Sequence, residues 1–79
     1  MGIAKTEAEL AERASRFIKA ELKRANVTYE ELATRLRDHG LEETRDSVAA
    51  KLKRGTFAAT FLLATLAALG MEAMRLEDL

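Results

Sequence analysis

Cysteine and proline are absent from the sequence, and histidine occurs once, at His39. Without cysteine the chain can form neither a disulfide nor a thiolate zinc site, and one histidine leaves a metal site short of its usual nitrogen ligands. We therefore expect no metal and no cofactor. Small domains without disulfides or a structural metal depend on their hydrophobic core or on a partner subunit for stability. The 79 residues must be held by helix packing, and we expect a homodimer to reinforce it.

Signals for sheets, membrane spans and secretion are also missing. No segment alternates apolar with polar residues or is rich in β-branched side chains, so the sequence predicts no sheet. The uncharged run from Phe57 to Met71 is shorter than the roughly 18 to 20 residues that span a bilayer, which favours a buried core helix. The first residues are polar and mixed in charge, unlike a signal peptide. We expect a cytoplasmic protein that does not contact a membrane.

The composition is that of an ordinary globular chain, with 48% apolar and 33% charged residues. Its length predicts one domain over residues 1–79, with residues 1–6 as a flexible N-terminus. The 13 basic and 13 acidic residues cancel, whereas nucleic-acid-binding domains are usually basic overall. The charge is uneven, however, because residues 44–56 carry four basic side chains and one acidic side chain.

Threonine and glycine mark where helices begin and end. Thr6 and Thr28 are each followed three residues later by glutamate, which is the pattern of a capping box, and Thr44 is a plain N-cap candidate. Glycines follow three of the apolar-periodic segments, where a left-handed C-cap favours glycine: Gly40, Gly55 and Gly70. These signals predict an all-α, compact bundle of four to five helices, at Glu7 to Ala25, Tyr29 to His39, Arg45 to Arg54, Phe57 to Leu69 and Glu72 to Glu77.

Apolar residues at helical spacing define the expected core. The stripe of the first helix consists of Leu10, Ala14, Phe17, Ile18, Leu22 and Ala25, and that of the second consists of Tyr29, Leu32, Ala33 and Leu36. The third helix has only Val48 and Leu52 to bury, which leaves its other side free for a partner. The fourth is apolar around much of its circumference and should be central, through Phe61, Leu62, Leu63, Leu66 and Leu69. We expect Leu76 and Leu79 to close the core.

Four segments, taken in order, match the pattern of a known DNA-binding fold. They are residues 27–33 (VTYEELA), residues 48–55 (VAAKLKRG), residues 62–70 (LLATLAALG) and residues 75–79 (RLEDL). Through them the chain from residue 17 onward resembles the lambda-repressor-like helix-turn-helix family, including its Cro and xenobiotic-response-element regulators, and is similar to small bacterial domains of that superfamily. The resemblance implies that residues 48–55 belong to a recognition helix, which ends in a basic residue and a glycine. Residues 40–43 lengthen the turn beyond the usual length of about 3 to 4 residues.

The resemblance gives the third helix the task of contacting DNA. Its outward residues are Asp46, Ser47, Ala50, Lys53 and Arg54, with Arg45, Ala49 and Lys51 on the flanks. We expect base-edge contacts from Arg45, Ser47, Ala50 and Lys51, and phosphate contacts from Lys53 and Arg54. Taken alone, the same residues also fit a solvated polar face whose alanines raise the helix propensity.

The starts of helices add Thr28, Tyr29 and Thr44 to the DNA-binding candidates. Thr28 is first of all an N-cap, although the backbone amides at such a helix start can also bind a phosphate. Tyr29 fits two roles equally well, beside a phosphate or over the edge of the core. His39 stands near a helix C-terminus, where a cation is favoured, so it fits a cap better than a ligand or a catalyst.

A catalytic arrangement is not evident, and we do not expect an enzyme. A nucleophile needs an adjacent base and an orienting group, but His39 has only Ser15 and Ser47 to serve, and no phosphate-binding glycine loop is present. Two functions remain. The basic third helix favours a sequence-specific DNA-binding domain of a bacterial transcriptional regulator, which binds double-stranded DNA as a homodimer. Zero net charge and the lengthened turn favour the alternative, a helical protein-protein interaction or regulatory module that keeps the fold without binding DNA.

Overall fold

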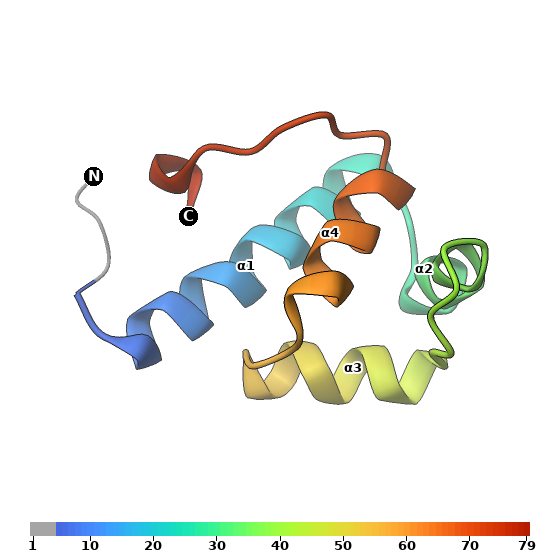
Figure 1. Cartoon of the computed structure of the whole chain (residues 1–79), viewed down its shortest axis with the longest axis horizontal. Coiled ribbons are helices and arrows are strands. Elements are labelled where there is room, and N and C mark those ends of the chain that lie inside the picture. The colour runs from blue at the N-terminus through green and yellow to red at the C-terminus, as the bar shows by residue number, and fades with distance from the viewer. Residues whose placement is uncertain (1–4) are drawn as a thin grey trace.

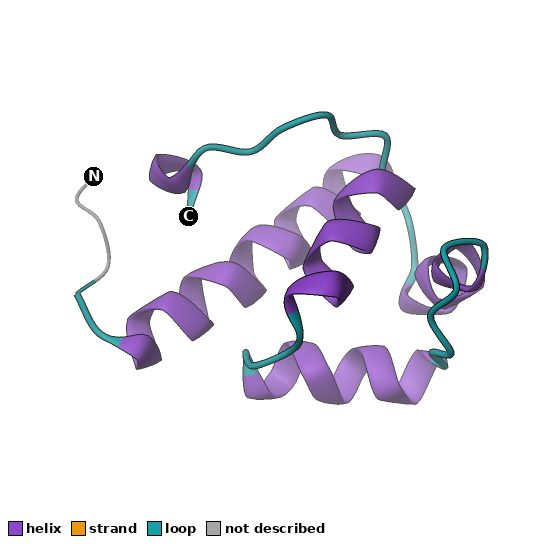
Figure 2. Cartoon of the chain, in the orientation of Figure 1, coloured by secondary structure: helices purple, strands orange, loops and turns teal. Residues whose placement is uncertain are grey.

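The computed structural model describes residues 5–79, which form four α-helices and a short 3-10 helix (Figure 1). The helices are α1 (Glu7–Ala25), α2 (Tyr29–Arg37), α3 (Arg45–Arg54), α4 (Ala59–Ala68) and η1 (Leu76–Asp78). Figure 2 shows no strand among these residues. The Cα radius of gyration is 12.0 Å, close to the roughly 11.6 Å of a compact domain of this length. The predicted all-α bundle is therefore confirmed.

Threonine side chains begin the first two helices, as predicted. The Thr6 hydroxyl accepts a hydrogen bond from the Glu9 amide at 3.1 Å, but the Glu9 carboxylate accepts from the Lys5 amide instead of closing the box at Thr6. Thr28 and Glu31 form the complete, reciprocal capping box. Of the N-terminus expected to be flexible, residues 1–4 lie outside the described residues, whereas Lys5 and Thr6 take part in capping α1.

Two helices are shorter than the apolar pattern predicts. α2 ends at Arg37 instead of His39, because the amides of residues 38–40 bond to carbonyls three residues back and Gly40 then takes a φ of 83°. α4 begins at Ala59 instead of Phe57, because Ala58 is extended and no side chain caps the helix. The Phe57 ring still packs near the core, with its centroid 5.1 Å from that of Phe61.

The predicted fifth helix is also mostly wrong. Gly70 ends α4 with a φ of 75°, and residues 71–75 then run without helical structure to η1. Figure 1 shows this tail passing back over the bundle toward α1. Leu79 is half-buried against the core, as expected, but Leu76 is 70% exposed. The tail therefore covers the core through Met71, Met74 and Leu79, and not through Leu76.

The core lies where the four helices meet. α2 packs against both α3 and α4, and α1 packs against α3. The buried apolar residues are Phe17, Ile18, Leu22, Val27, Leu32, Ala33, Leu36, Val48, Leu52, Phe61, Ala64 and Leu66. The stripes predicted for the second and third helices are thus confirmed, with Tyr29 half-buried at the edge.

Besides Leu76, three residues expected in the core are exposed. Leu10 is 44% exposed because the N-terminal part of α1 extends past the other helices (Figure 1), and Ala25 is exposed at the other end of that helix. Leu63 is 63% exposed, because it stands two residues, or about 200° of helix rotation, from the buried Phe61. α4 is therefore buried on one side and open on the other. No helix in the described part of the chain is both long and apolar enough to cross a membrane.

Candidate functional site

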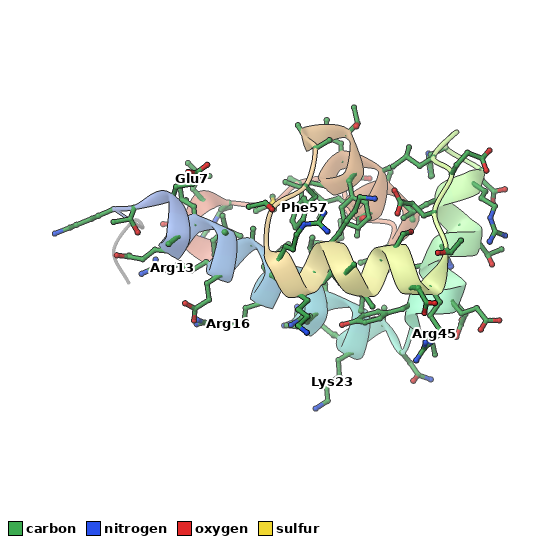
Figure 3. All side chains as sticks on the ribbon, turned by 90° about the horizontal axis from the view of Figure 1, so that it is seen from below. Glu7, Arg13, Arg16, Lys23, Arg45 and Phe57 are labelled. Carbon is green, nitrogen blue, oxygen red and sulfur yellow. The ribbon has the colours of Figure 1, made fainter. Side chains whose placement is uncertain are left out.

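α3 lies along the outside of the bundle and is held by two side chains. Val48 and Leu52 are 0% and 1% exposed, which confirms the predicted thin apolar face. On the other side Ala50, Lys53 and Arg54 are exposed, as predicted. Figure 3 views the molecule from the side of α3 and shows that no other helix covers this surface. The helix is thus fixed by one face and open on the other.

The start of α3 is held by a cluster that the sequence reasoning missed. Thr44 is the N-cap, and it forms a capping box with Ser47, where only a plain cap was predicted. The Ser47 hydroxyl donates to Glu43 Oε1 at 2.6 Å, and Lys51 Nζ lies 2.9 Å from both carboxylate oxygens of Glu43. Two of the predicted base-contacting residues, Ser47 and Lys51, are therefore half-buried and bound to a carboxylate.

Glu43 is the centre of this cluster, and its side chain is 8% exposed. Burial raises the pKa of the Glu43 carboxyl, but hydrogen bonds from Ser47 and Lys51 and the Lys51 charge outweigh burial and lower the pKa below its usual value. Lys51 Nζ also lies 5.7 Å from the centre of the Phe61 ring. The charge of Lys51 is thus neutralised inside the protein. Ser47 and Lys51 are four residues apart on one face of α3, which the sequence shows, whereas Glu43 precedes the helix and is brought to them by the turn before it.

The starts of α2 and α3 meet in a shallow hollow. It is lined by Thr28, Tyr29, Glu30, Glu31, Thr34 and Arg45, so the structure brings together three of the predicted candidates. The Thr28 hydroxyl is occupied, since it accepts from the Glu31 amide at 3.1 Å and donates to the Glu31 carboxylate at 3.2 Å. Tyr29 packs against the core, which fits the second of its two roles. Because two carboxylates line the hollow, it is a poor place for a phosphate.

The other end of α3 abuts α1. Gly55 ends α3 with a φ of 75°, and a Cβ atom at this position would lie 2.8 Å from the Ala11 carbonyl oxygen. The buried Ser15 hydroxyl donates to the Leu52 carbonyl across the same junction. A second hollow opens here, and its basic lining residues are Arg16, Lys19, Lys53 and Arg54. Lys53 and Arg54, predicted as phosphate contacts, are thus joined by cations of α1.

Most cations of the described chain have a carboxylate or a backbone carbonyl as partner, but most of those around this hollow do not. Arg16 lies 2.5 Å from Glu12, and Arg45 lies 3.2 Å from Asp46. Among residues 5–79, Lys53 and Arg54 have no carboxylate or hydrogen-bond partner for their side chains, and the same holds for two lysines of α1, Lys19 and Lys23. The α1 lysines were not predicted as candidates, although their spacing of four residues places them on one helix face.

The three side chains weighed as catalytic candidates do not form a catalytic arrangement. Ser15 donates to Leu52 and Ser47 donates to Glu43, while His39 is exposed in the turn after α2. Over the described residues, no group of three histidine, cysteine or acidic residues could hold a metal ion.

Comparison with curated proteins and with solved structures gives no match for this chain. A family described as a domain of unknown function (DUF6471) matches residues 10–74. The matched region contains all four α-helices except the first turn of α1, and it includes every candidate residue on α2 and α3. Because the match covers most of the chain, the protein belongs to the DUF6471 family.

Proposed function

We propose that this domain binds double-stranded DNA through the outward side of α3, as the DNA-binding part of a transcriptional regulator. The observation that carries the proposal is the position of α3, which is anchored by Val48 and Leu52 and presents an exposed, basic opposite side. An α-helix fits the major groove of B-form DNA, where its side chains can reach base edges. The exposed Ala50 lets the helix backbone approach the bases closely.

Within α3, we assign base contacts to Arg45 and Ala50 and phosphate contacts to Lys53 and Arg54. The Arg45 side chain is 67% exposed and pairs only with Asp46, whose side chain is 91% exposed. Such exposed pairs contribute little free energy, so Arg45 can exchange its partner for a guanine at small cost. Ser47 and Lys51 leave the set of base contacts, because Glu43 holds both side chains.

The resemblance to lambda-repressor-like regulators supports the proposal, and the geometry of residues 38–44 is compatible with it. This connection is long, but the Leu41 amide bonds to the Leu36 carbonyl and Arg37 donates to the Glu43 carbonyl at 3.4 Å. Such bonds give α3 a defined angle to α2, as recognition requires. A homodimer would then read two half-sites about one turn of DNA apart.

The test is selection of binding sites from random duplexes, followed by titration of the selected site at two salt concentrations. We expect an enriched motif, and we expect Arg45→Ala to cost about 1 to 3 kcal/mol of binding free energy and to relax the motif. Arg75→Ala is the matched control, since Arg75 is an exposed arginine paired with Glu77 in the tail. A parent protein that enriches no motif and shows no salt-dependent binding would contradict the proposal.

A second candidate, a protein-interaction module, is favoured by the open side of α4. Leu63 is 63% exposed and borders a mostly apolar hollow formed with Leu66, Met71 and Met74. Exposed apolar groups that gather in one place often mark contacts with another protein. If DNA binding fails, sedimentation of the parent and of Leu63→Ser tests this reading. Self-association that the substitution abolishes would support it.

A further inference from the structure

We propose that α1 carries a phosphate-binding surface, formed by Lys19 and Lys23, which extends the cations of α3 along the DNA backbone. The proposal rests on the proposed function and adds a second helix to the interface. Its ligand is the sugar-phosphate backbone of the same duplex that α3 reads. These two lysines would position the protein on DNA without reading its sequence.

The spacing of the α1 cations fits a row of contacts on one side of the helix. Lys19 and Lys23 are four residues apart, which corresponds to a rise of about 6 Å along the helix axis. Arg16 continues the same row toward the N-terminus of α1. In Figure 3, Arg16 and Lys23 project from α1 toward the same side of the molecule as Arg45 of α3. A single duplex can therefore meet the cations of both helices.

The junction between the helices holds the two sets of cations in a fixed relation. Lys19 lines the same hollow as Lys53 and Arg54, so the α1 row continues directly into the end of α3. Gly55 permits the close approach to Ala11, and the buried hydrogen bond from Ser15 joins the two helices. Binding would therefore require little rearrangement of the backbone, which lowers its entropic cost.

The charge of the hollow favours an anion. Its carboxylates are Glu7 and Glu12, and Glu12 is already paired with Arg16. The hollow also contains three cations with no partner among the described side chains, so its unpaired charges are one negative and three positive. These cations are Lys19, Lys53 and Arg54. The hollow at the start of α2 has the opposite balance, since Glu30 and Glu31 line it with Arg45. The backbone phosphates should therefore lie on the α1 side of α3.

The experiment compares the salt dependence of binding for the double variant Lys19→Ala/Lys23→Ala with that of the parent on the selected duplex. Each phosphate contact releases about 0.9 counterions, so the slope of log K against log salt should fall by about 1.8 for the double variant. The motif selected from random duplexes should stay the same. Lys19→Arg/Lys23→Arg keeps both charges and should restore the parent slope.

The matched control is Arg24→Ala/Arg75→Ala, which removes the same charge from cations paired with Glu21 and Glu77. The control should leave the slope nearly unchanged, and thermal melting should show that all variants are folded. An unchanged slope for the lysine variant, with parent binding intact, would overturn the α1 surface alone. A changed motif would also overturn it, because the lysines would then read bases. A parent that binds no DNA would overturn the proposed function as well.

Discussion

At the scale of single residues, Glu43 is the charged side chain that the described fold buries, and its partners make stability depend on pH. Its pKa is lowered in the folded state, since hydrogen bonds from Ser47 and Lys51 and the Lys51 charge outweigh the effect of burial. A carboxyl with a lowered folded pKa stabilises the protein above its unfolded pKa. This contribution is lost as the pH falls through the folded pKa.

We therefore expect Glu43→Gln to lower the free energy of unfolding at neutral pH by about 1.5 to 3 kcal/mol, as for hydrogen bonds to a charged group. Because glutamine does not titrate, the difference from the parent should shrink as the pH falls below about 4.3, the usual pKa of a glutamate. Denaturant unfolding from neutral pH to below this value measures both effects. Glu42→Gln is the control, since Glu42 is exposed and should change little. A difference that stays constant down to the acid end would contradict the role of the Glu43 charge.

Two glycines with similar φ values allow the cost of a left-handed backbone to be measured apart from the cost of a steric clash. Gly40 and Gly55 have φ values of 83° and 75°, but a Cβ at Gly40 would meet nothing within 4 Å, whereas at Gly55 it would lie 2.8 Å from the Ala11 carbonyl oxygen. Gly40→Ala should cost about 1 to 2 kcal/mol for the left-handed backbone alone. Gly55→Ala should cost about 1 to 3 kcal/mol more, because the α1–α3 junction must open. Equal losses in thermal melting would mean that this junction is loose.

At the scale of helices, local signals predict the starts of α1, α2 and α3 and the ends of α1 and α3. Each threonine cap marks the start of its helix, because a hydroxyl bonding to an amide three residues later is a local event. α1 ends at Ala25 as predicted, and Asn26, with a φ of 58°, takes the left-handed conformation there that Gly55 takes after α3. α4 has no side-chain cap, and its true start depends on how Phe57 packs against Phe61. The start of α4 therefore depends on tertiary contacts that periodicity does not contain.

Two leucines of α4 with different exposure should differ sharply in their response to truncation. Leu66 is 8% exposed, so Leu66→Ala should lower the free energy of unfolding by about 2 to 5 kcal/mol through lost burial and a residual cavity. Leu63 is 63% exposed on the same helix, and Leu63→Ala should change the free energy of unfolding by no more than about 0.5 kcal/mol. The pair controls for helix propensity, since both change leucine to alanine. Similar losses in denaturant unfolding would mean that α4 is buried all round.

At the scale of the molecule, the sequence predicts the helices and the thin apolar face of α3 but not the arrangement of charge. A helical wheel suggests that Lys51 is free to contact a ligand. The path of residues 38–44 between α2 and α3 places Glu43 against it. Lys19 and Lys53 are far apart in the chain, and the close contact at Gly55 brings them to one hollow. Zero net charge therefore conceals a basic surface, because the acidic residues neutralise cations elsewhere.

Assembly should stabilise the protein, because a domain of this size without disulfides or a metal gains stability from a second copy. If folding and dimerisation are coupled, the melting temperature must rise with protein concentration. We expect such a rise, and we expect Leu63→Ser to reduce it, since the charged side of α1 is assigned to DNA and Leu63 is exposed on the open side of α4. Leu10→Ser is the matched control, as Leu10 is 44% exposed near the N-terminus of α1. A melting temperature independent of concentration, together with a monomer mass by sedimentation, would exclude the homodimer. The selected DNA motif should then be a single half-site instead of a symmetric pair.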